Sequence, residues 1–387
     1  MSKLRVAILT NGGGRGGGDQ LILQLAKYAE NIHWTGIVVE QAFENPAQVH
    51  RILRDSGGIP PIYHPKKEKS PEYKGIQYVE GLAPTILKLC EESDILLCWF
   101  SDTILKIHEY INIPTVQYIQ GSDDHLKEYV TLSSDACDYH VATSENTKKL
   151  FAQKYREDLH LIYSGVDINR VVPTHGRAVQ RKMWGISEEQ KVLYFLGRLV
   201  VEKNASAVIQ AISQLPEEWI GIIQGSGKEL AHLESEAARH APGRIHFLDP
   251  WVHPGNPFSV SDVYILLSDF EGDPVSVKEA MVAGVPTVVS DIPVFKEHQK
   301  NFGDISMLLP ARASSKDVAE AILLADSPEF RNNVASRARA VVWEYFNIQH
   351  YARQWEELFY QIAEQESHKN RFPVLNRMEG EVPAKRP

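Results

Sequence analysis

Glu271 and Glu279 are two carboxylates spaced so that they could bind one ligand. They lie in the segment EGDPVSVKEAMVAGVP, and an apolar run at 263–267 predicts a strand that ends shortly before Glu271. Pro274 suits the first turn of the helix that follows, and Gly284 suits its end. In a pure helix this spacing would separate the two carboxylates by about 12 Å. That separation suits a ligand in which two hydroxyl-rich groups are joined by a diphosphate.

Each glutamate also has a simpler structural interpretation. The neighbours of Glu279 in the sequence include Val277, Ala280 and Met281. A carboxylate in so apolar a helix needs a partner, which a salt bridge or a helix-dipole contact would supply. Glu271 could be a solvated loop charge. For either glutamate taken singly the structural interpretation is the stronger one, and only the combination favours a site.

Arg198 and Lys203 are cations that match the same ligand chemistry. Arg198 follows an apolar run at 191–196, which predicts a strand and places this arginine at the strand's carboxyl end. Two cations at that position can stabilise a departing diphosphate without a metal ion. An ordinary loop charge paired with Glu202 explains the pattern about as well.

Two loops rich in glycine could approach a phosphate or a sugar. Residues 11–18 read NGGGRGGG between a predicted strand and a predicted helix, so Gly17 and Gly18 lie where the helix begins. Residues 224–227 read QGSG after another strand, which places Gly225 on the nucleotide side of a site. Backbone without side chains at a helix N-terminus can donate N–H groups to a phosphate. A flexible loop without a ligand is the alternative for the first run.

The first glycine run also permits a different function. Gly12, Gly14 and Gly17 satisfy the pattern GxGxxG, and Glu40 ends the next predicted strand, as in a dinucleotide site. The signal is weak, because six glycines in seven positions satisfy almost any glycine template. A dinucleotide-dependent oxidoreductase therefore stays open as an alternative.

The elements that must position these residues follow a strand and helix alternation. Short apolar runs separated by helix-length stretches predict a parallel sheet covered on both faces. In the first half these runs are 4–10, 36–39, 95–99, 115–119 and 139–142. In the second half they are 191–196, 219–223, 244–248, 263–267, 287–290 and 306–309. The predicted fold class is therefore α/β, with two doubly wound parallel-sheet domains and a ligand crevice at the carboxyl ends of the strands.

The predicted boundaries follow from shifts in composition. The polar stretch VVPTHGRAVQRKMWG separates the two strand series, and the end of the chain is polar and contains proline. We predict an N-terminal domain at 1–172, a linker at 173–190, a second domain at 191–345, a closing helix at 346–364 and a flexible tail at 365–387.

Composition excludes several classes of protein. The chain has 387 residues, 41 Lys and Arg against 50 Asp and Glu, and a net charge of −9, so nonspecific binding to nucleic acid has no electrostatic support. Its three cysteines, Cys90, Cys98 and Cys137, lack the paired spacing of a zinc site or a disulfide framework. No apolar run approaches the roughly 18 residues of a membrane span, and the first residues lack a signal-peptide core. We expect a cytoplasmic protein, and peripheral contact with a membrane has no support from the net charge.

The segment from Glu271 to Glu279 resembles the signature of retaining glycosyltransferases of family 4. In that family two glutamates are separated by seven residues in a pattern of the form EGFP...EAMA.GvPvV. Three further segments resemble the family, namely GGGDQLILQLA, YSGVD at 163–167 and LGRLVVEKN. The tail WEYFNIQHYARQWEELF resembles its closing helix, which usually crosses back to the first domain. The resemblance implies the GT-B fold, in which two Rossmann-like domains face each other across a crevice.

The resemblance also implies a role for each candidate residue. Glu279 would bind the ribose hydroxyls of a nucleotide, and Glu271 would bind a hydroxyl of the donor sugar. Arg198 and Lys203 would hold the diphosphate. The remaining contacts would come from glycines and from the start of the helix that carries Glu279, at Gly17, Gly18, Gly225, Gly272, Asp273, Pro274 and Val275. No metal ion and no cofactor would be required beyond the nucleotide sugar itself.

Gln120 is the departure from the family pattern. Many members carry a histidine after the fourth strand of the first domain, where this chain reads VQYIQGSDDH with Gln120 at the matching position. Glutamine can hydrogen-bond a sugar hydroxyl but does not titrate, so no general base lies there. His125 is nearby in the sequence but out of register. We therefore place Gln120 among the catalytic residues and leave open a non-catalytic nucleotide-sugar-binding subunit.

The leading hypothesis is a retaining, metal-independent glycosyltransferase. It would move a sugar from a nucleotide-diphosphate sugar to the hydroxyl of a glycan, a lipid-linked acceptor or a small molecule. The first domain would bind the acceptor and the second the nucleotide sugar. The basic segment KKEKSPEYKG at 66–75 could dock an anionic or lipid-linked acceptor, although a solvated loop explains it better.

Overall fold

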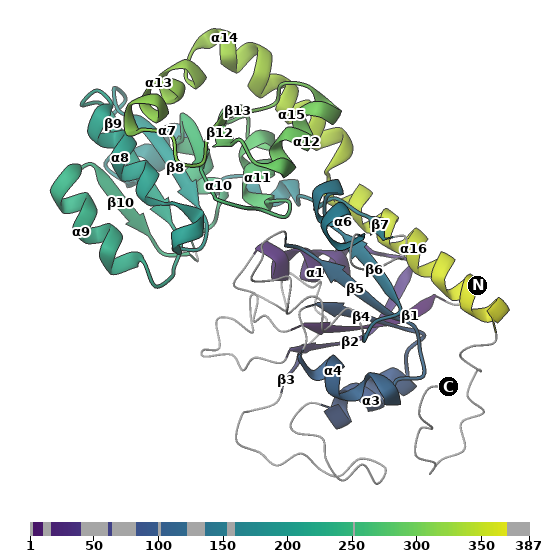
Figure 1. The fold of residues 1–387 in the computed structure, drawn as a ribbon. Helices are drawn as coiled ribbons and strands as arrows, with labels where there is room; N and C mark the ends of the chain where they lie inside the picture. Colours follow the sequence, from purple (N-terminus) through teal and green to yellow (C-terminus); the bar gives the residue numbers. More distant parts are fainter. Residues whose placement is uncertain are drawn as a thin grey trace. The chain divides into compact units, whose positions relative to one another are not determined.

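The chain divides into two compact units. The structure is a computed structural model that describes residues 3–10, 17–39, 61–63, 83–99, 102–121, 136–152, 159–250 and 252–369. Unit 1 consists of Met1–Gly165 together with Ile348–Pro387, and unit 2 is Val166–Asn347 (Figure 1). The segment 66–75 and the residues Gly12, Gly14, Glu40 and His125 lie outside the described residues.

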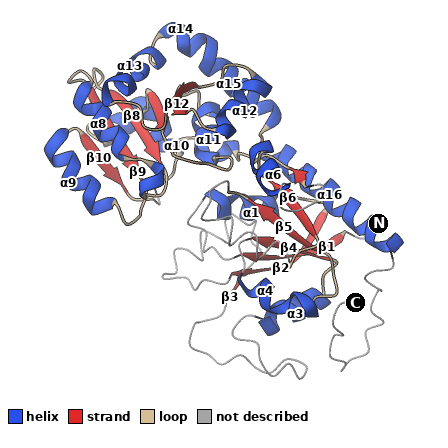
Figure 2. Ribbon diagram, in the orientation of Figure 1, coloured by secondary structure: helices blue, strands red, loops and turns tan. Residues whose placement is uncertain are grey.

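Unit 1 is built on a parallel sheet of seven strands in the order β3-β2-β1-β4-β5-β6-β7 (Figure 2). The strands are β1 (Leu4–Thr10), β2 (Ile32–Val39), β3 (Pro61–Tyr63), β4 (Ile95–Trp99), β5 (Thr115–Ile119), β6 (Tyr139–Ala142) and β7 (His160–Leu161). The five expected strands of this half are all present, and β2 begins four residues earlier than its apolar run suggests. The short strands β3 and β7, at the two edges of the sheet, were not predicted. Runs of two or three residues carry too little periodicity to be recognised.

The helices of unit 1 include the last long helix of the chain. They are α1 (Gly17–Tyr28), α3 (Ala83–Glu91), α4 (Asp102–Ile107), η1 (His108–Tyr110), α6 (Glu145–Ala152) and α16 (Ile348–Lys369). Helix α16 belongs to this unit because its side chains are bonded to the first part of the chain. The backbone N–H of Asn31 donates to Oε1 of Glu356 at 2.7 Å, and the hydroxyl of Tyr139 donates to Glu366. The Trp355 ring lies edge-on to Tyr118 with their centroids 5.0 Å apart.

Unit 2 contains a parallel sheet of six strands in the order β10-β9-β8-β11-β12-β13. Its strands are β8 (Lys191–Leu196), β9 (Trp219–Gln224), β10 (Ile245–Leu248), β11 (Val263–Leu266), β12 (Thr287–Ser290) and β13 (Met307–Leu309). All six lie within a residue of the predicted runs. The central strands β8, β9, β11 and β12 are apolar and buried, as expected for a sheet covered on both faces.

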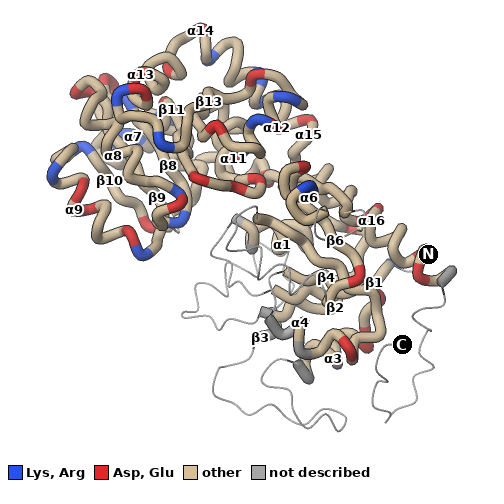
Figure 3. Tube along the Cα trace, viewed as in Figure 1, with Lys and Arg blue, Asp and Glu red and all other residues tan. Residues whose placement is uncertain are grey.

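The helices of unit 2 cover this sheet and carry charges of both signs. They are η2 (Ile168–Val171), α7 (Arg177–Met183), η3 (Val201–Lys203), α8 (Ser206–Gln214), α9 (Leu230–His240), α10 (Gly255–Val260), α11 (Val275–Val282), α12 (Pro293–Phe302), α13 (Ser315–Ala325), α14 (Pro328–Phe330), η4 (Arg331–Ala335) and α15 (Ser336–Tyr345). Basic and acidic residues are interspersed along helices such as α9 and α13, in accord with the lack of a generally basic surface (Figure 3).

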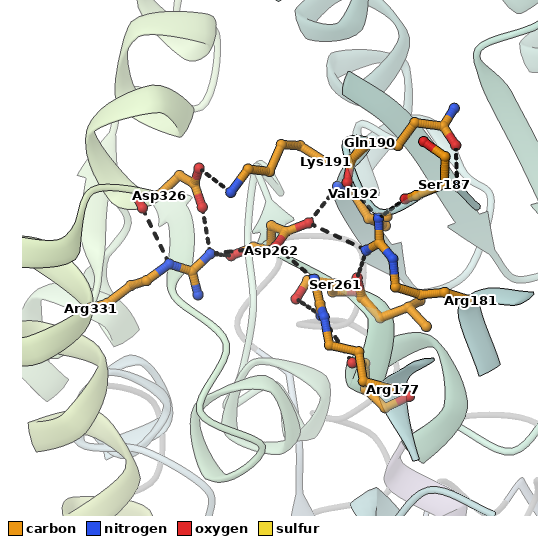
Figure 4. Close-up of polar contacts among 12 residues, drawn as sticks. Arg177, Arg181, Ser187, Gln190, Lys191, Val192, Ser261, Asp262, Asp326 and Arg331 are labelled. Carbon is orange, nitrogen blue, oxygen red and sulfur yellow. Dashed lines mark hydrogen bonds and ion pairs between the residues drawn. The ribbon is translucent and has the colours of Figure 1, made fainter. Parts of the chain in front are cut away.

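The segment 173–190, which we expected to be a linker, is instead part of unit 2. It contains helix α7, whose arginines reach the residues at the start of β11 (Figure 4). Arg177 Nη2 donates to Oδ1 of Asp262 at 2.8 Å, and Arg181 Nη1 donates to the carbonyl of Val260 at 3.3 Å. Polar and basic composition suggested a connection, but those arginines attach the helix to the sheet. The boundary of unit 2 consequently lies at Val166 rather than near 190.

No helix among the described residues is both long enough and apolar enough to cross a membrane.

Candidate functional site

The candidate residues of unit 2 follow three adjacent strands at their carboxyl ends. Arg198 follows β8, Gly225 follows β9, and Glu271 follows β11. These strands are neighbours in the order β9-β8-β11, so all three loops leave from the same edge of the sheet. This edge is where open parallel sheets bind their ligands.

Glu271 and Lys203 form an ion pair between two of these loops. Lys203 Nζ lies 2.5 Å from Oε1 of Glu271, which also accepts a hydrogen bond from Ser268 Oγ at 2.7 Å. The Glu271 side chain is only 7% exposed and that of Lys203 16%. The backbone N–H of Asp269 donates to the carbonyl of Glu202 at 2.9 Å, which also connects the two loops. The solvated loop charge considered for Glu271 is therefore excluded.

Arg198 extends into solvent beside Glu202. Its Nη2 lies 3.6 Å from Oε1 of Glu202, and its side chain is 60% exposed. The pairing with Glu202 that offered a structural interpretation is thus present. An exposed pair at this distance contributes little stability, about 0 to 1 kcal/mol. The guanidinium therefore costs little to redirect toward an anion.

Glu279 is buried in α11 and bonded to Arg170. Nε of Arg170 donates to Oε1 of Glu279 at 3.1 Å, and the carboxylate side chain is 4% exposed. Arg170 lies in η2, a short turn whose N-cap Asp167 accepts from the backbone N–H of Asn169. The sequence predicted that Glu279 needs a partner, but a residue 109 positions away gave no signal that it was Arg170.

Asp273 lies in the loop before α11, and its side chain points into the interior of unit 2. Lys278 Nζ donates to its Oδ2 at 2.6 Å, and Nε2 of His298 lies 3.2 Å from its Oδ1. The Asp273 side chain has no exposed surface. Any contact that this residue makes with a ligand must therefore come from its main chain. Sequence reasoning missed Lys278 and His298 as its partners.

The start of α11 is shifted by one residue from the expectation. Pro274 occupies the N-cap position with φ −73° and ψ 119°, and the helix begins at Val275. The N-cap residue Pro274 makes no side-chain hydrogen bond to the first turn, so the N–H groups of that turn donate none to it. Gly272 is buried, whereas Pro274 and Val275 are partly exposed. The end at Gly284 is as predicted, since this glycine has a φ of 77° just beyond the helix.

Tyr264 fastens the end of β8 to the first turn of α11. Its hydroxyl lies 3.2 Å from the carbonyl of Leu196 and 2.8 Å from Oγ of Ser276. Burial raises the pKa of this phenol well above its ordinary value, so it stays protonated and can donate. This role of Tyr264 was not predicted from the sequence.

The loops after β8 and β9 are paired by their backbones. The N–H of Leu199 donates to the carbonyl of Ser226 at 2.8 Å, and the N–H of Glu229 donates to the carbonyl of Leu199 at 3.0 Å. A Cβ on Gly225 would lie 1.9 Å from the carbonyl oxygen of Gly197, and one on Gly227 would lie 2.1 Å from that of Leu199. Both positions require glycine because another backbone passes so closely.

In unit 1 the structure brings Gly18 and Gln120 together. A Cβ on Gly18 would lie 2.4 Å from Oε1 of Gln120 and 2.4 Å from Cζ2 of Trp99. Gly18 is in the first turn of α1, which begins at Gly17, while Trp99 ends β4 and Gln120 follows β5. Nε2 of Gln120 is buried and has no hydrogen-bond partner in the part of the chain that the structure describes. Trp99 was not singled out in the sequence.

Metal-binding clusters and cavities bear on what else the described part of the chain could bind. Within the described ranges, no three His, Cys, Asp or Glu side chains are grouped so that they could hold a metal ion. A cavity of about 340 Å³ in unit 2 is lined by residues of α8, α9 and α13 and by Val200, Leu267 and Arg312, and by none of the candidate residues.

Comparison with known proteins gives a family match for part of the chain. Residues 176–341 match the family model described as glycosyl transferases group 1. The chain is 27% identical over 254 residues to an N-acetyl-alpha-D-glucosaminyl L-malate synthase of Bacillus anthracis, covering 63% of this chain and 65% of that protein. It is 28% identical over 184 residues to a D-inositol 3-phosphate glycosyltransferase of Xylanimonas cellulosilytica, covering 43% of each. Each alignment thus spans less than two thirds of the relative.

Solved structures confirm the predicted fold class. HepE of Anabaena, crystallised in complex with UDP and glucose, superposes with a TM-score of 0.78 at 19% identity, covering 92% of this chain and 100% of that one. The same protein in complex with UDP-glucose gives a TM-score of 0.77 at 19% identity, again with 92% and 100% coverage. The two parallel-sheet α/β units are therefore those of the GT-B fold.

Proposed function

We propose, from the match of residues 176–341 to the family model of glycosyl transferases group 1, that the chain is a retaining glycosyltransferase of family 4. It would transfer a sugar from a nucleotide-diphosphate donor to an acceptor hydroxyl without a metal ion.

One observation carries the proposal. The two glutamates of the segment at 271–279 are both buried, and each is bonded to a cation from another part of unit 2: Glu271 to Lys203 and Glu279 to Arg170. Burying a charged pair costs free energy because both charges lose their water. A pair that is buried at the ligand-binding edge of a parallel sheet is therefore expected to have a function or a compensating hydrogen-bond network. We propose that two such pairs, one on the loop and one on the helix, would orient two polar groups of a single ligand.

The diphosphate of the donor would be stabilised by cations and by backbone N–H groups. Lys203 and the exposed Arg198 supply positive charge, and the first turn of α11 has N–H groups that its N-cap residue leaves without a side-chain bond. A helix N-terminus favours an anion through both its dipole and these donors. Because these groups carry the charge stabilisation, we propose that no metal ion is needed.

The reaction would proceed on one face of the sugar. The bond between the anomeric carbon and the diphosphate oxygen breaks, and a bond from that carbon to the acceptor oxygen forms on the same face. The proton of the acceptor hydroxyl passes to the departing phosphate, so no side chain has to act as a base. Glu271 would hold a sugar hydroxyl, and Gln120 would contribute hydrogen bonds rather than proton transfer.

A structural neighbour suggests which donor nucleotide to test first. HepE of Anabaena was crystallised with UDP and with UDP-glucose. We therefore propose a uridine-diphosphate sugar as the first donor to test, followed by guanosine, adenosine and thymidine diphosphate sugars. The acceptor would be a glycan, a lipid-linked sugar or a small molecule with a free hydroxyl.

A donor screen tests the function directly. The purified chain would be incubated with each nucleotide sugar, thermal stabilisation and nucleotide release would be measured, and products would be identified by mass spectrometry. A free ligand concentration of a hundred times Kd stabilises the folded state by about 2.7 kcal/mol, which raises Tm by several degrees. We expect one class of donor to give both effects, activity to survive EDTA, and the product to keep the anomeric configuration of the donor.

A matched pair of variants makes the screen specific. Glu279→Gln removes the buried carboxylate, whereas Glu234→Gln makes the same change on the exposed face of α9. Loss of donor stabilisation in the first and not in the second is expected. Stabilisation by a nicotinamide dinucleotide and by no nucleotide sugar would favour the oxidoreductase instead. Donor binding without hydrolysis or transfer to any acceptor would favour a non-catalytic binding subunit.

A further inference from the structure

Three buried ionisable side chains meet beneath the loop that precedes α11. Asp273 comes from the loop, Lys278 from α11 and His298 from α12. Their side chains are 0%, 2% and 3% exposed. The carboxylate lies between the other two, with Lys278 Nζ at 2.6 Å from Oδ2 and His298 Nε2 at 3.2 Å from Oδ1.

Aromatic rings enclose this cluster. Lys278 Nζ lies 3.9 Å from the centroid of the Phe346 ring, so its charge also interacts with the face of that ring. The imidazole of His298 has its ring centroid 5.5 Å from that of Phe346 and 6.2 Å from that of Phe295. The three polar groups therefore lie in an apolar environment where charges interact strongly and water is scarce.

Stability alone does not account for such a cluster. Burial lowers the pKa of Lys278, which shows that its charged form is disfavoured by desolvation. A buried ion pair is often no more stabilising than apolar side chains of the same volume. What the ion pair adds over apolar side chains is directional hydrogen bonding, because each hydrogen bond fixes the position of the donor relative to the acceptor.

The elements held by these bonds are the ones that carry the proposed donor contacts. Asp273 is flanked by Gly272 and Pro274, and Lys278 immediately precedes Glu279 on α11. The bond from Lys278 to Asp273 therefore sets the main chain of 271–275 against the first turns of the helix. The contact with His298 sets the same carboxylate against α12.

We propose that Asp273, Lys278 and His298 are positioning residues for the donor site. They fix the loop main chain and the first turn of α11 so that Glu271, Glu279 and the N–H groups between them can contact the same donor molecule. None of the three side chains touches the donor. The inference rests on the proposed function, since it names residues that serve the same site.

Replacing Asp273 and Lys278 singly and together distinguishes an effect on the donor site from an effect on the stability of the fold. Asp273→Asn removes the charge opposite Lys278, and Lys278→Met removes the charge opposite Asp273, which keeps its contact with His298. Asp273→Leu with Lys278→Met instead replaces the pair by apolar side chains of similar size. The measurements are Tm, the KM for donor and for acceptor, and the Kd for the nucleoside diphosphate.

We expect each single variant to raise donor KM and nucleoside diphosphate Kd by tenfold or more and to lower Tm. The double variant should recover most of the lost Tm but keep the raised donor KM, while acceptor KM stays near the wild-type value. A double variant that recovers both would show a purely structural role and overturn the proposal. If the double variant does not fold, single variants that fold with wild-type donor KM would overturn it.

A control pair lies elsewhere in unit 2. Asp326 accepts from Arg331 at 2.5 Å and lies 3.2 Å from Lys191 Nζ, in the network of Figure 4. Asp326→Asn should lower Tm without changing donor KM. If the wild-type chain neither binds nor consumes any nucleotide sugar, the proposed function fails and this assignment with it. A wild-type enzyme with normal turnover whose single variants keep their donor KM refutes the positioning role alone.

Discussion

Lys203 Nζ lies 2.5 Å from Oε1 of Glu271 and joins two loops that leave neighbouring strands. Lys203 ends the short turn η3 after β8, and Glu271 lies in the loop after β11. The pair is neutral as a whole, so in the proposed reaction an incoming diphosphate would meet a lysine whose charge is already partly balanced. As negative charge develops on the leaving group, this lysine would shift its interaction toward it and so contribute mainly in the transition state.

Lys203→Met is therefore expected to affect turnover more than binding. Loss of one charge-stabilising donor typically lowers kcat by about 10²- to 10³-fold. Donor KM should change by less than tenfold. Steady-state kinetics with a saturating acceptor would measure both. A variant whose donor KM rises while kcat is unchanged would show that Lys203 serves binding only.

Removal of Arg170 tests the other charged pair. Arg170→Ala leaves Glu279 buried without this cation, and we expect the nucleoside diphosphate to bind about tenfold more weakly because the carboxylate loses its orientation. Isothermal titration calorimetry would measure the affinity. Arg337→Ala on α15 is a suitable control, because this arginine belongs to the same unit and lies outside the candidate site. Equal affinity of Arg170→Ala and the wild type would remove Arg170 from the site.

Gly225→Ala should distort the backbone of the loop after β9. The added methyl group would lie 1.9 Å from the carbonyl oxygen of Gly197, so the paired loops after β8 and β9 must separate. Overpacking of this kind costs about 1 to 3 kcal/mol. Chemical denaturation should show the loss, and Gly243→Ala is the control, because a Cβ there meets nothing within 4 Å. Gly243 has a φ of 71°, so a modest cost is expected for the control too.

Asp273 should make the free energy of unfolding decrease at acidic pH. Burial alone would raise the pKa of Asp273, but the charge of Lys278 and the contact with His298 outweigh it and hold the pKa below its ordinary value. The stabilisation is therefore complete above the ordinary carboxyl range and is lost as the pH falls through the lower, folded-state pKa. Asp273→Asn removes this dependence. Free energies of unfolding measured on acidification should fall less steeply in the variant than in the wild type.

Gln120→Leu should separate activity from stability in unit 1. Nε2 of Gln120 is buried without a hydrogen-bond partner among the described residues, and such a group typically costs about 1 to 3 kcal/mol. Leucine has a similar size and no unsatisfied donor, so Tm should stay the same or rise. Transfer should become slower if the amide serves a sugar hydroxyl. A variant with a lower Tm and unchanged transfer would contradict this interpretation.

The sheets could be predicted from the sequence because their strands are buried on both faces. Continuous apolar runs such as 95–99 and 191–196 coincide with β4 and β8. The edge strands β3 and β7 are too short to give a pattern. The helix α7 was mistaken for a linker because its arginines look like solvated charges until Asp262, some 85 positions away, is brought beside Arg177.

For the candidate site, the sequence allowed the proposed ligand-binding groups to be predicted better than the residues that hold those groups in place. Glu271 and Glu279 were identified by their spacing, and that Glu279 needed a partner was inferred from its apolar neighbours. Arg170 and His298 were not identified as partners, because pairing between residues far apart in the sequence leaves no local pattern. Lys278 was overlooked for another reason: a lysine in a helix is ordinarily exposed, and only the buried carboxylate of Asp273 makes its burial acceptable.

Val166 and Asn347, the first and last residues of unit 2, lie side by side and form an isolated β-bridge. The N–H of Val166 donates to the carbonyl of Phe346 at 2.7 Å, and Val166 pairs with Asn347 as in a parallel sheet. On the other side of the boundary, a Cβ on Gly165 would lie 2.6 Å from Cβ of Tyr351, so the two cut ends of unit 1 also meet. Unit 2 is thus an insertion that enters and leaves at one point. Residues 166–347 are consequently a natural fragment for separate expression, and a short Gly-Ser linker could rejoin 165 to 348.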